Sequence, residues 1–469
     1  MTLPLLTRRQ MLDRLGGCGL GLLGLSFLSQ GRALSAESAH PLAPKQPHFP
    51  ARAKRVIHIF CNGGASQMDT FDPKPALQKW AGKPLPLHYS TENPTFGAMP
   101  SPFTFQRYGQ SGLECSEIFA QLAQAHADDL CVIRSMHTDQ SIHENALMMM
   151  NTGSLVVPRP SLGSWITYGL GTENQNLPGY VVLVPKGLPV RGEENWKSSF
   201  LPGAYQGTYV ATDRADGKFI DNLRNARLGS DAQSAQMKLL GALNQHHLEA
   251  REDDPALASR IHNYETAFRM QMEATDAFDL TQEPESIRKM YGDGPQNKQM
   301  LLARRLIERG VRFVQVWHGR EQPWDSHKDL EKDHRKLAAE CVQGITALLS
   351  DLKSRGLLKD TLVLWAGEFG RTPTVELIAD GKKAQAGRDH NRYGFTTWMA
   401  GGGVKGGLAY GSTDEFGFAA VENRVHVHDL HATILHLMGF DHERLTYEHA
   451  GRNFRLTDVH GHVVKDLLA

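Results

Sequence analysis

The chain has 469 residues, a length that allows one large domain or two to three domains of ordinary size. Hydrophobic residues make up 41% of it and charged residues 22%, as is usual for a globular protein that buries a large core. Lys+Arg and Asp+Glu both number 51, so no net charge favours a nucleic-acid partner and we expect none. Histidine is abundant, at 22, and many histidines lie near Asp or Glu in the last third of the chain, which favours a metal site.

The first 36 residues have the pattern of an export signal. The pair Arg8-Arg9 is followed by an apolar run over residues 18–28 and then by small residues. This order describes a secretory signal, and the arginine pair resembles the twin-arginine type. The apolar run is shorter than a typical membrane-spanning helix. The alternative is that the segment is kept as an uncleaved N-terminal anchor. We expect export to the periplasm or beyond through the twin-arginine machinery, no membrane span in the mature chain, and a linker over residues 37–54.

Short apolar runs along the rest of the chain predict strands that alternate with helices. The clearest helix spans residues 335–356, where apolar side chains recur every three or four positions and Gly356 ends the pattern. Residues 215–310 are polar, helical in period and poor in strand signals, so we interpret them as a helical insertion. The sequence therefore predicts an α/β fold from residue 55 to 469, with a central, mostly parallel sheet sandwiched by helices. The predicted strands lie at residues 55–61, 129–135, 179–185, 311–317, 361–367 and 395–401.

Four cysteines lie outside the export signal. Export allows disulfides, but these residues border apolar runs or lie on a helical apolar face, which is equally typical of buried free thiols. No CxxC pair is present, so a thiolate zinc site is not expected. The four are Cys61, Cys115, Cys131 and Cys341.

Acidic and imidazole side chains collect where the predicted strands end. In open α/β sheets ligands bind beyond the carboxyl ends of the strands, and a divalent metal gathers nitrogen and oxygen ligands from such places. Directly after an apolar strand, the carboxylate of Glu368 would be partly buried and would need a cation. The alternatives without metal binding are that Asp69 caps a helix and that Asp325 and His327 lie on a solvated loop. The full set of candidate ligands is Asp69, Asp325, His327, Glu368 and His390.

The glycine run at residues 401–407 invites a different interpretation, because Gly401, Gly403 and Gly406 match GxGxxG. That fingerprint requires a strand before it and a helix after it. Turn residues follow here instead of a helical pattern. We interpret the run as a tight turn after a strand, and this argues against a dinucleotide-binding oxidoreductase.

Five motifs together resemble a known family. They occur in the order GGASQMDTFDPKP, WDSHKD, TLVLWAGEFGRTP, GRDHNRYGFTTWMAGGGVKGG and VHVHDLHATILHLMGFD. They are similar to motifs of the exported bacterial family called domain of unknown function 1501, which itself resembles the alkaline phosphatase and sulfatase superfamily. The resemblance runs from about Arg55 to the C-terminus. It implies an alkaline phosphatase-like fold with two divalent metals at the carboxyl ends of the central sheet.

The same resemblance, carried over residue by residue, assigns roles at the site. Glu368 takes the place of an aspartate, and Phe369 stands where the superfamily has a histidine. The superfamily carries a Ser, Thr or Cys nucleophile at the start of a helix that ends in Thr-Gly, and that position holds His143 here. His143 is then a metal ligand, a nucleophile, or a residue of a site that no longer catalyses.

Two functions follow as hypotheses. The first is a hydrolase of phosphate or sulfate esters that depends on a divalent metal ion such as zinc or calcium, with His143 and Arg371 as catalytic candidates. Arg371 would fork onto an anionic oxygen of the substrate, a small anionic ester or a polysaccharide; its alternative role is a surface ion pair. The second is an exported binding or assembly protein that kept the fold and lost the activity.

Overall fold

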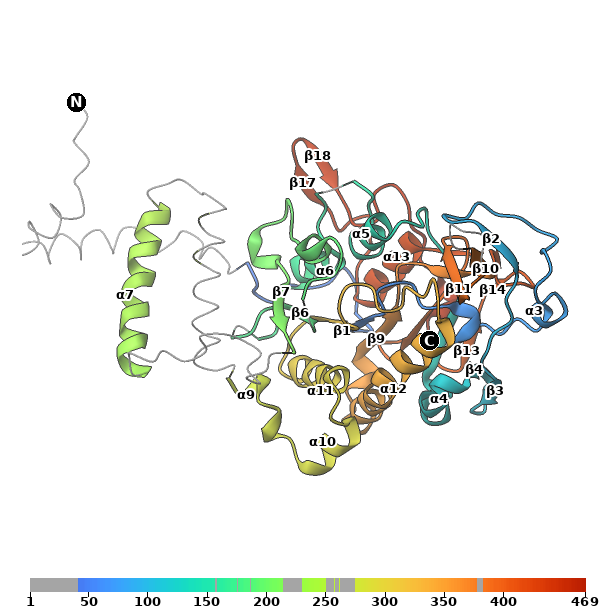
Figure 1. Cartoon of the computed structure of the whole chain (residues 1–469). Coiled ribbons are helices and arrows are strands. Elements are labelled where there is room, and N and C mark those ends of the chain that lie inside the picture. Colours follow the sequence, from blue (N-terminus) through green and yellow to red (C-terminus); the bar gives the residue numbers. More distant parts are fainter. Residues whose placement is uncertain are drawn as a thin grey trace, which may run out of the picture. The chain divides into compact units, whose positions relative to one another are not determined.

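The computed structural model describes residues 41–156, 158–174, 176–185, 187–213, 230–249, 257, 261, 275–377 and 383–469 (Figure 1). The export signal predicted for residues 1–36 lies outside these residues. So do the start of the predicted linker and much of the predicted insertion. Leu42–Ala469 form one unit of the fold.

A nine-stranded mixed sheet forms the centre of this unit. Its strands are β1 (Arg55–Phe60), β5 (Leu130–His137), β6 (Tyr180–Val184), β7 (Thr208–Ala211), β8 (Phe313–Trp317), β9 (Thr361–Ala366), β12 (Phe395–Ala400), β13 (Leu408–Tyr410) and β16 (Val425–His426). Their order is β13-β5-β12-β9-β1-β8-β6-β7, with β16 paired to β5. All pairs are parallel except those of β12, which runs antiparallel to both β5 and β9. The mostly parallel sheet is confirmed, and every predicted strand is present.

Helices cover both faces of the sheet because side chains alternate across each strand. In β1, Ile57 and Ile59 pack into one hydrophobic cluster, whereas Val56 and Phe60 pack into the other. The first cluster is completed by α4 (Ala120–His126), α10 (Glu285–Tyr291), α11 (Pro295–Glu308) and α12 (Leu330–Ser354). The second is completed by α5 (His143–Thr152), α6 (Leu162–Leu170) and α13 (Val427–Leu437). Figure 1 shows the two sets of helices on either side of the sheet, as the α/β prediction requires.

The helix predicted over residues 335–356 is α12, which begins five residues earlier, at Leu330. In the range predicted as a helical insertion, the described residues form α7 (Ser230–Glu249), α9 (Thr275–Phe278), α10, α11 and a short 3-10 turn, and no strand. Leu302 and Leu306 of α11 are buried in the first cluster, so this end of the range belongs to the helical layer on the sheet. No helix in the described part of the chain is long and apolar enough to cross a membrane.

A small antiparallel sheet lies beside the main one. It consists of β11 (Lys383–Asn391), β10 (Gly370–Leu377) and β2 (Thr95–Ala98), and β10 follows β9 after only three residues. Arg371 of β10 pairs with His390 of β11 in its register. The remaining short elements are α3 (Ala76–Lys79), β3 (Phe105–Tyr108), β4 (Leu113–Ser116), β14 (Ser412–Thr413), β15 (Ala420–Glu422), β17 (Tyr447–His449) and β18 (Arg452–Phe454).

The glycine run forms the tight turn that the sequence predicts. It links β12 to β13, and no helix follows it. Gly401 has a φ of 68°, and a Cβ built there would stand 2.2 Å from the Leu358 carbonyl oxygen. Only glycine fits this close approach, so the run has a packing role rather than a nucleotide-binding one.

The cysteines at 61, 115, 131 and 341 are all free and buried. Burial raises the pKa of the Cys131 thiol to about 12 and holds that of Cys341 well above its usual value. These thiols therefore stay protonated and act as small apolar side chains.

Candidate metal centre

The candidate site lies at the edge of the sheet where β1, β8 and β9 end. A glycine turn follows β1, the loop with Asp325 and His327 follows β8, and Glu368 follows β9. His143 is the first residue of α5, and His390 stands near the end of β11. The structure therefore brings four of the five predicted ligands together, with His143 beside them.

Asp325 is the hub of this cluster. Its Oδ1 atom lies 2.8 Å from His327 Nε2 and 3.0 Å from His390 Nε2. Its Oδ2 atom lies 3.3 Å from His143 Nε2. Arg371 Nη2 donates to Asp325 Oδ1 at 2.6 Å. One carboxylate thus contacts three imidazoles and a guanidinium that come from four separate parts of the chain.

A carboxylate contacts the second nitrogen of each imidazole. Glu368 Oε1 lies 2.7 Å from His143 Nδ1, and Glu92 Oε2 lies 2.7 Å from His390 Nδ1. Glu376 Oε2 contacts His327 Nδ1. This is the arrangement by which proteins orient metal-binding histidines, because the outer acceptor fixes the ring and raises the basicity of the inner nitrogen.

The donor atoms fit a divalent cation. His143, Asp325 and His390 each offer an atom within 4.8 Å of the others, and His327, Glu376 and Asp389 form an adjacent set that meets the same limit. Imidazole nitrogen with carboxylate oxygen is the ligand chemistry of zinc and related metals. Glu368 is fully buried, yet its Oε2 atom has no hydrogen-bond partner. A nearby cation would stabilise this carboxylate.

Charge coupling inside the cluster is strong. Burial opposes ionisation of Asp325, but hydrogen bonds from the three histidines and the charge of Arg371 outweigh it and hold the pKa of Asp325 far below its usual value. Burial lowers the pKa of His390 to about 3, whereas contacts with Asp325 and Glu376 raise the pKa of His327 to about 9 despite burial. Burial thus dominates the pKa of His390, whereas contacts with carboxylates dominate those of His143 and His327.

Arg371 lies deeper than the predicted role suggests. Its side chain is fully buried, and its Nε atom donates to the Gly64 carbonyl oxygen at 2.9 Å. Its Nη1 atom donates to the Arg388 carbonyl oxygen at 3.1 Å, while Nη2 serves Gly63 and Asp325. The guanidinium thus ties the glycine turn to Asp325, and it is not the surface ion pair that was the alternative.

Asp69 is the one predicted ligand that the structure places elsewhere. It is fully buried and accepts hydrogen bonds from Arg388 Nε at 2.8 Å and Arg388 Nη2 at 3.2 Å, as well as from Ser66 Oγ. Burial opposes its ionisation, but the contacts with Arg388 prevail and lower the pKa of Asp69. It belongs to neither of the two converging sets among the described residues.

The glycine turn after β1 is part of the site. Gly63 has a φ of 108°, and a Cβ built there would lie 2.5 Å from the backbone nitrogen of Asp325. The Gly63 nitrogen also donates to Glu368 Oε1 at 2.8 Å. Glycine at this position lets the turn reach both the Asp325 loop and the end of β9.

The set of ligands predicted from the sequence does not include Glu92, Glu376 or Asp389. Glu92 lies in the loop before β2, and the other two lie within β10 and β11. They reach the site through the small sheet, and neither a strand end nor a motif marks Glu92 or Glu376. The only available signal was the position of Asp389 next to His390.

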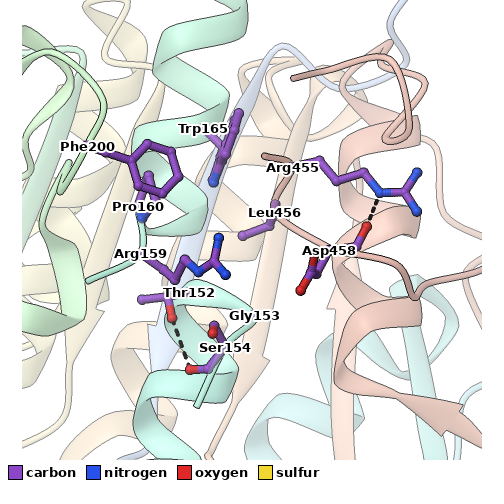
Figure 2. Close-up of a pocket in the computed structure, with 10 residues that line it drawn as sticks. All are labelled: Thr152, Gly153, Ser154, Arg159, Pro160, Trp165, Phe200, Arg455, Leu456 and Asp458. Atoms are coloured by element: carbon purple, nitrogen blue, oxygen red, sulfur yellow. Dashed lines mark hydrogen bonds between the residues drawn. The ribbon is translucent and has the colours of Figure 1, made fainter. Parts of the chain in front are cut away.

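A cavity at the other end of α5 has no room for a substrate. It measures about 10 Å³, roughly the space of one water molecule. Figure 2 shows Thr152, Gly153 and Ser154 on one side and Arg455 and Asp458 on the other. The Thr-Gly motif therefore ends α5 and borders no substrate pocket here.

The fold and the site define an α/β protein with a candidate metal centre at the carboxyl edge of its sheet. The chain belongs to the family described as "Protein of unknown function (DUF1501)", whose match covers residues 53–468. No curated protein matches its sequence.

Solved structures with similar folds include sulfatases and phosphatases. The PsFucS1 sulfatase from Pseudoalteromonas sp. is 12% identical, with 84% of this chain and 69% of that one covered and a TM-score of 0.34. A TAB5 alkaline phosphatase mutant with bound Mg is 10% identical, with 84% and 100% covered and a TM-score of 0.35. The C-terminal periplasmic domain of EcEptC from Escherichia coli, in complex with Zn, is 8% identical, with 91% and 99% covered and a TM-score of 0.34. Any proposal about activity here depends on the residues of the site itself.

Proposed function

We propose that this protein is an exported, metal-dependent hydrolase of phosphate or sulfate esters. The observation that supports this proposal is the convergence of His143, Asp325 and His390 beside the set of His327, Glu376 and Asp389, each set with ligand atoms within 4.8 Å. Two adjacent sets accord with the two metals that the family resemblance implies. Bound divalent cations would polarise the ester oxygen and stabilise the charge that develops in the transition state.

The protein's own residues hold this arrangement in place. Glu368 and Glu92 fix the rings of His143 and His390 through their outer nitrogens, at 2.7 Å each. Phe369 packs against both rings, with centroid distances of 4.7 and 4.6 Å, and covers one side of them. The ligands are therefore oriented before any substrate arrives.

We assign Arg371 a positioning role. Its contacts with the Gly63-Gly64 carbonyls and with Asp325 occupy the guanidinium inside the protein. It holds the Asp325 carboxylate against the turn after β1. Contact with an anionic ester oxygen would then fall to the cations held at the centre.

His143 is proposed as a metal ligand and not as a nucleophile. Both of its nitrogens already face carboxylates, Asp325 and Glu368. The substrate class that suits a cationic centre is an anionic ester, carried either by a small molecule or by a polysaccharide. Export through the twin-arginine machinery rests on the pattern of the first 36 residues alone.

A second candidate function is an exported binding or assembly protein that retains the centre without turnover. The observation that favours it is the imidazole of His143 at the start of α5, where the superfamily carries a hydroxyl or thiol nucleophile.

Elemental analysis of the purified mature protein tests the proposal. We expect stoichiometric divalent metal, lost in Asp325→Ala and His390→Ala, and an affinity about 10–100-fold weaker in Glu368→Gln, which keeps the size of the side chain. Turnover of aryl phosphates and aryl sulfates, measured on the same samples, separates the two candidates. Stoichiometric metal with no turnover of any ester supports the binding protein, and full metal in all three variants refutes the centre.

A further inference from the structure

A second group of histidines lies at the N-terminus of α13. It lines a pocket of about 400 Å³ that shares no residue with the candidate metal centre. The polar side chains around this pocket are Asp139, His426, His428, Asp429, His460 and His462.

Three imidazoles and one carboxylate come close together in this pocket. The ring of His428 lies 4.9 Å from that of His426 and 5.0 Å from that of His460, measured between centroids. His426 Nε2 lies 3.1 Å from Asp139 Oδ2. These residues come from the loop after β5, the start of α13 and the C-terminal segment.

The backbone around the pocket is fixed by a capping box. His426 is the N-cap of α13, and its Nδ1 atom accepts a hydrogen bond from the His428 nitrogen at 3.2 Å. Asp429 accepts from the His426 nitrogen at 2.9 Å and from the His462 nitrogen at 2.7 Å. The Asp429 carboxylate therefore joins the C-terminal segment to the helix, while His426 Nε2 faces Asp139.

His428 carries the clearest sign of a missing partner. It is only 5% exposed, and its Nδ1 atom has no hydrogen-bond partner. Burying such a group without a partner costs free energy that a ligand would recover. Burial, together with His426 and His460, lowers the pKa of His428 to about 4.

We propose that His426, His428, His460 and Asp139 form a separate site for a divalent transition metal of the zinc, copper or nickel class. Neutral imidazoles with one carboxylate suit these metals better than calcium or magnesium. The carboxylates of Asp139 and Asp429 oppose an anion, although a helix N-terminus alone would attract one.

Metal binding at this site requires two side chains to move. Among the described residues, ligand atoms converge within 4.8 Å only in the two sets of the candidate centre. His460 is exposed and the Asp139 side chain is 54% exposed, so both side chains can reorient around a cation held by His426 and His428.

Zinc alone is the probe for this site. Equilibrium dialysis of the mature protein, followed by elemental analysis, compares the wild type with His428→Gln/His460→Gln, with Asp325→Asn, and with His88→Gln as an exposed-histidine control. We expect the double variant to bind one zinc fewer than the wild type and the control, and Asp325→Asn to keep the pocket zinc. Equal zinc in the double variant and the wild type would overturn the site.

The single variant His460→Gln provides a second test that should not disturb folding, because this histidine is exposed. In an Asp325→Asn background it should weaken zinc binding at least tenfold and reduce the number of imidazole nitrogens coupled to Cu²⁺ in the EPR spectrum. Unchanged affinity and an unchanged spectrum would refute the proposal. If Asp325→Asn loses no metal, the proposed candidate metal centre is refuted. The comparison of zinc binding with and without His460 still tests the pocket independently.

Discussion

At the scale of single residues, the buried ion pair of Asp69 and Arg388 has a structural role that the position of Asp69 in the sequence does not indicate. The two residues are 319 positions apart, and both are fully buried. Asp69 follows the first strand in the way a metal ligand would, but its oxygens already face a guanidinium and a hydroxyl. No local sequence pattern predicts this ion pair, because its two residues lie far apart in the chain.

Asp69→Asn should therefore destabilise the fold without removing metal. Loss of one partner of a buried ion pair typically costs about 3–5 kcal/mol, because the other charge stays buried without compensation. The measurement is the free energy of unfolding by denaturant, with the metal content of the same sample. Asp325→Asn is the matched comparison and should lose metal; a metal-free Asp69→Asn of normal stability would return Asp69 to the set of ligands.

His58 should make stability depend on pH. It is fully buried in β1, and burial together with His431 lowers its pKa to about 3, against 6.5 for the unfolded chain. Between these values the unfolded state binds a proton that the folded state does not, so stability is full above pH 6.5 and falls as the pH decreases. The slope is up to about 1.4 kcal/mol per pH unit for one such group.

Denaturant titrations of His58→Gln between pH 6.5 and pH 4 test this expectation. The variant should show a shallower loss of stability than the wild type, and His88→Gln, which alters an exposed histidine, should follow the wild type. Identical slopes in all three proteins would mean that His58 does not contribute.

At the scale of elements, the apolar pattern of α12 predicts its role as well as its existence. Leu337, Cys341, Ile345, Leu348 and Leu352 are all buried in the cluster on one face of the sheet. The periodicity was sufficient because one face of this helix packs on the sheet and the other is exposed. The first turn, from Leu330, was missed because charged residues dominate it.

Leu348→Ala should lower the free energy of unfolding by about 2–5 kcal/mol, through lost burial and the cavity left behind. Leu348 is fully buried, whereas Lys336 on the same helix is exposed. Lys336→Ala should change stability by about 0.5 kcal/mol or less, and it serves as the control in the same denaturant series. Equal effects at the two positions would contradict the packing described for α12.

The strands and the site differ in how far the sequence predicts them. Strands such as β1 and β9 are apolar runs bounded by turns, a local signal that needs no knowledge of the rest of the fold. Asp325 and Glu368 were found because parallel strands end at one edge. His390 was found because it precedes β12, whose start lies at that edge because β12 runs antiparallel to β9. Glu92 and Glu376 reach the site through the pairing of β10 with β2 and β11, which no local pattern predicts.

At the scale of the whole molecule, the candidate centre joins parts of the chain that range from Glu92 to His390. A cation bound there stabilises the folded state because the unfolded chain does not assemble the same ligands. The expected gain is about 2.7 kcal/mol when free metal exceeds its Kd a hundredfold. Treatment with a chelator should lower the unfolding temperature, and returning the metal should restore it.

Asp325→Asn provides the comparison for this measurement. Its unfolding temperature should respond much less to chelator, because the remaining ligands bind weakly. A wild-type protein that unfolds at the same temperature with and without chelator would show that the carboxylates and imidazoles of the centre are satisfied by one another.

The four buried thiols can report local unfolding in the regions around them. Each lies in a different place: at the end of β1, in β4, in β5 and on α12. A reagent that alkylates thiolate can reach Cys61, Cys115, Cys131 or Cys341 only while the surrounding segment is open. Mass spectrometry of the labelled peptides over time would therefore rank the local unfolding rates of four regions in the unmodified chain.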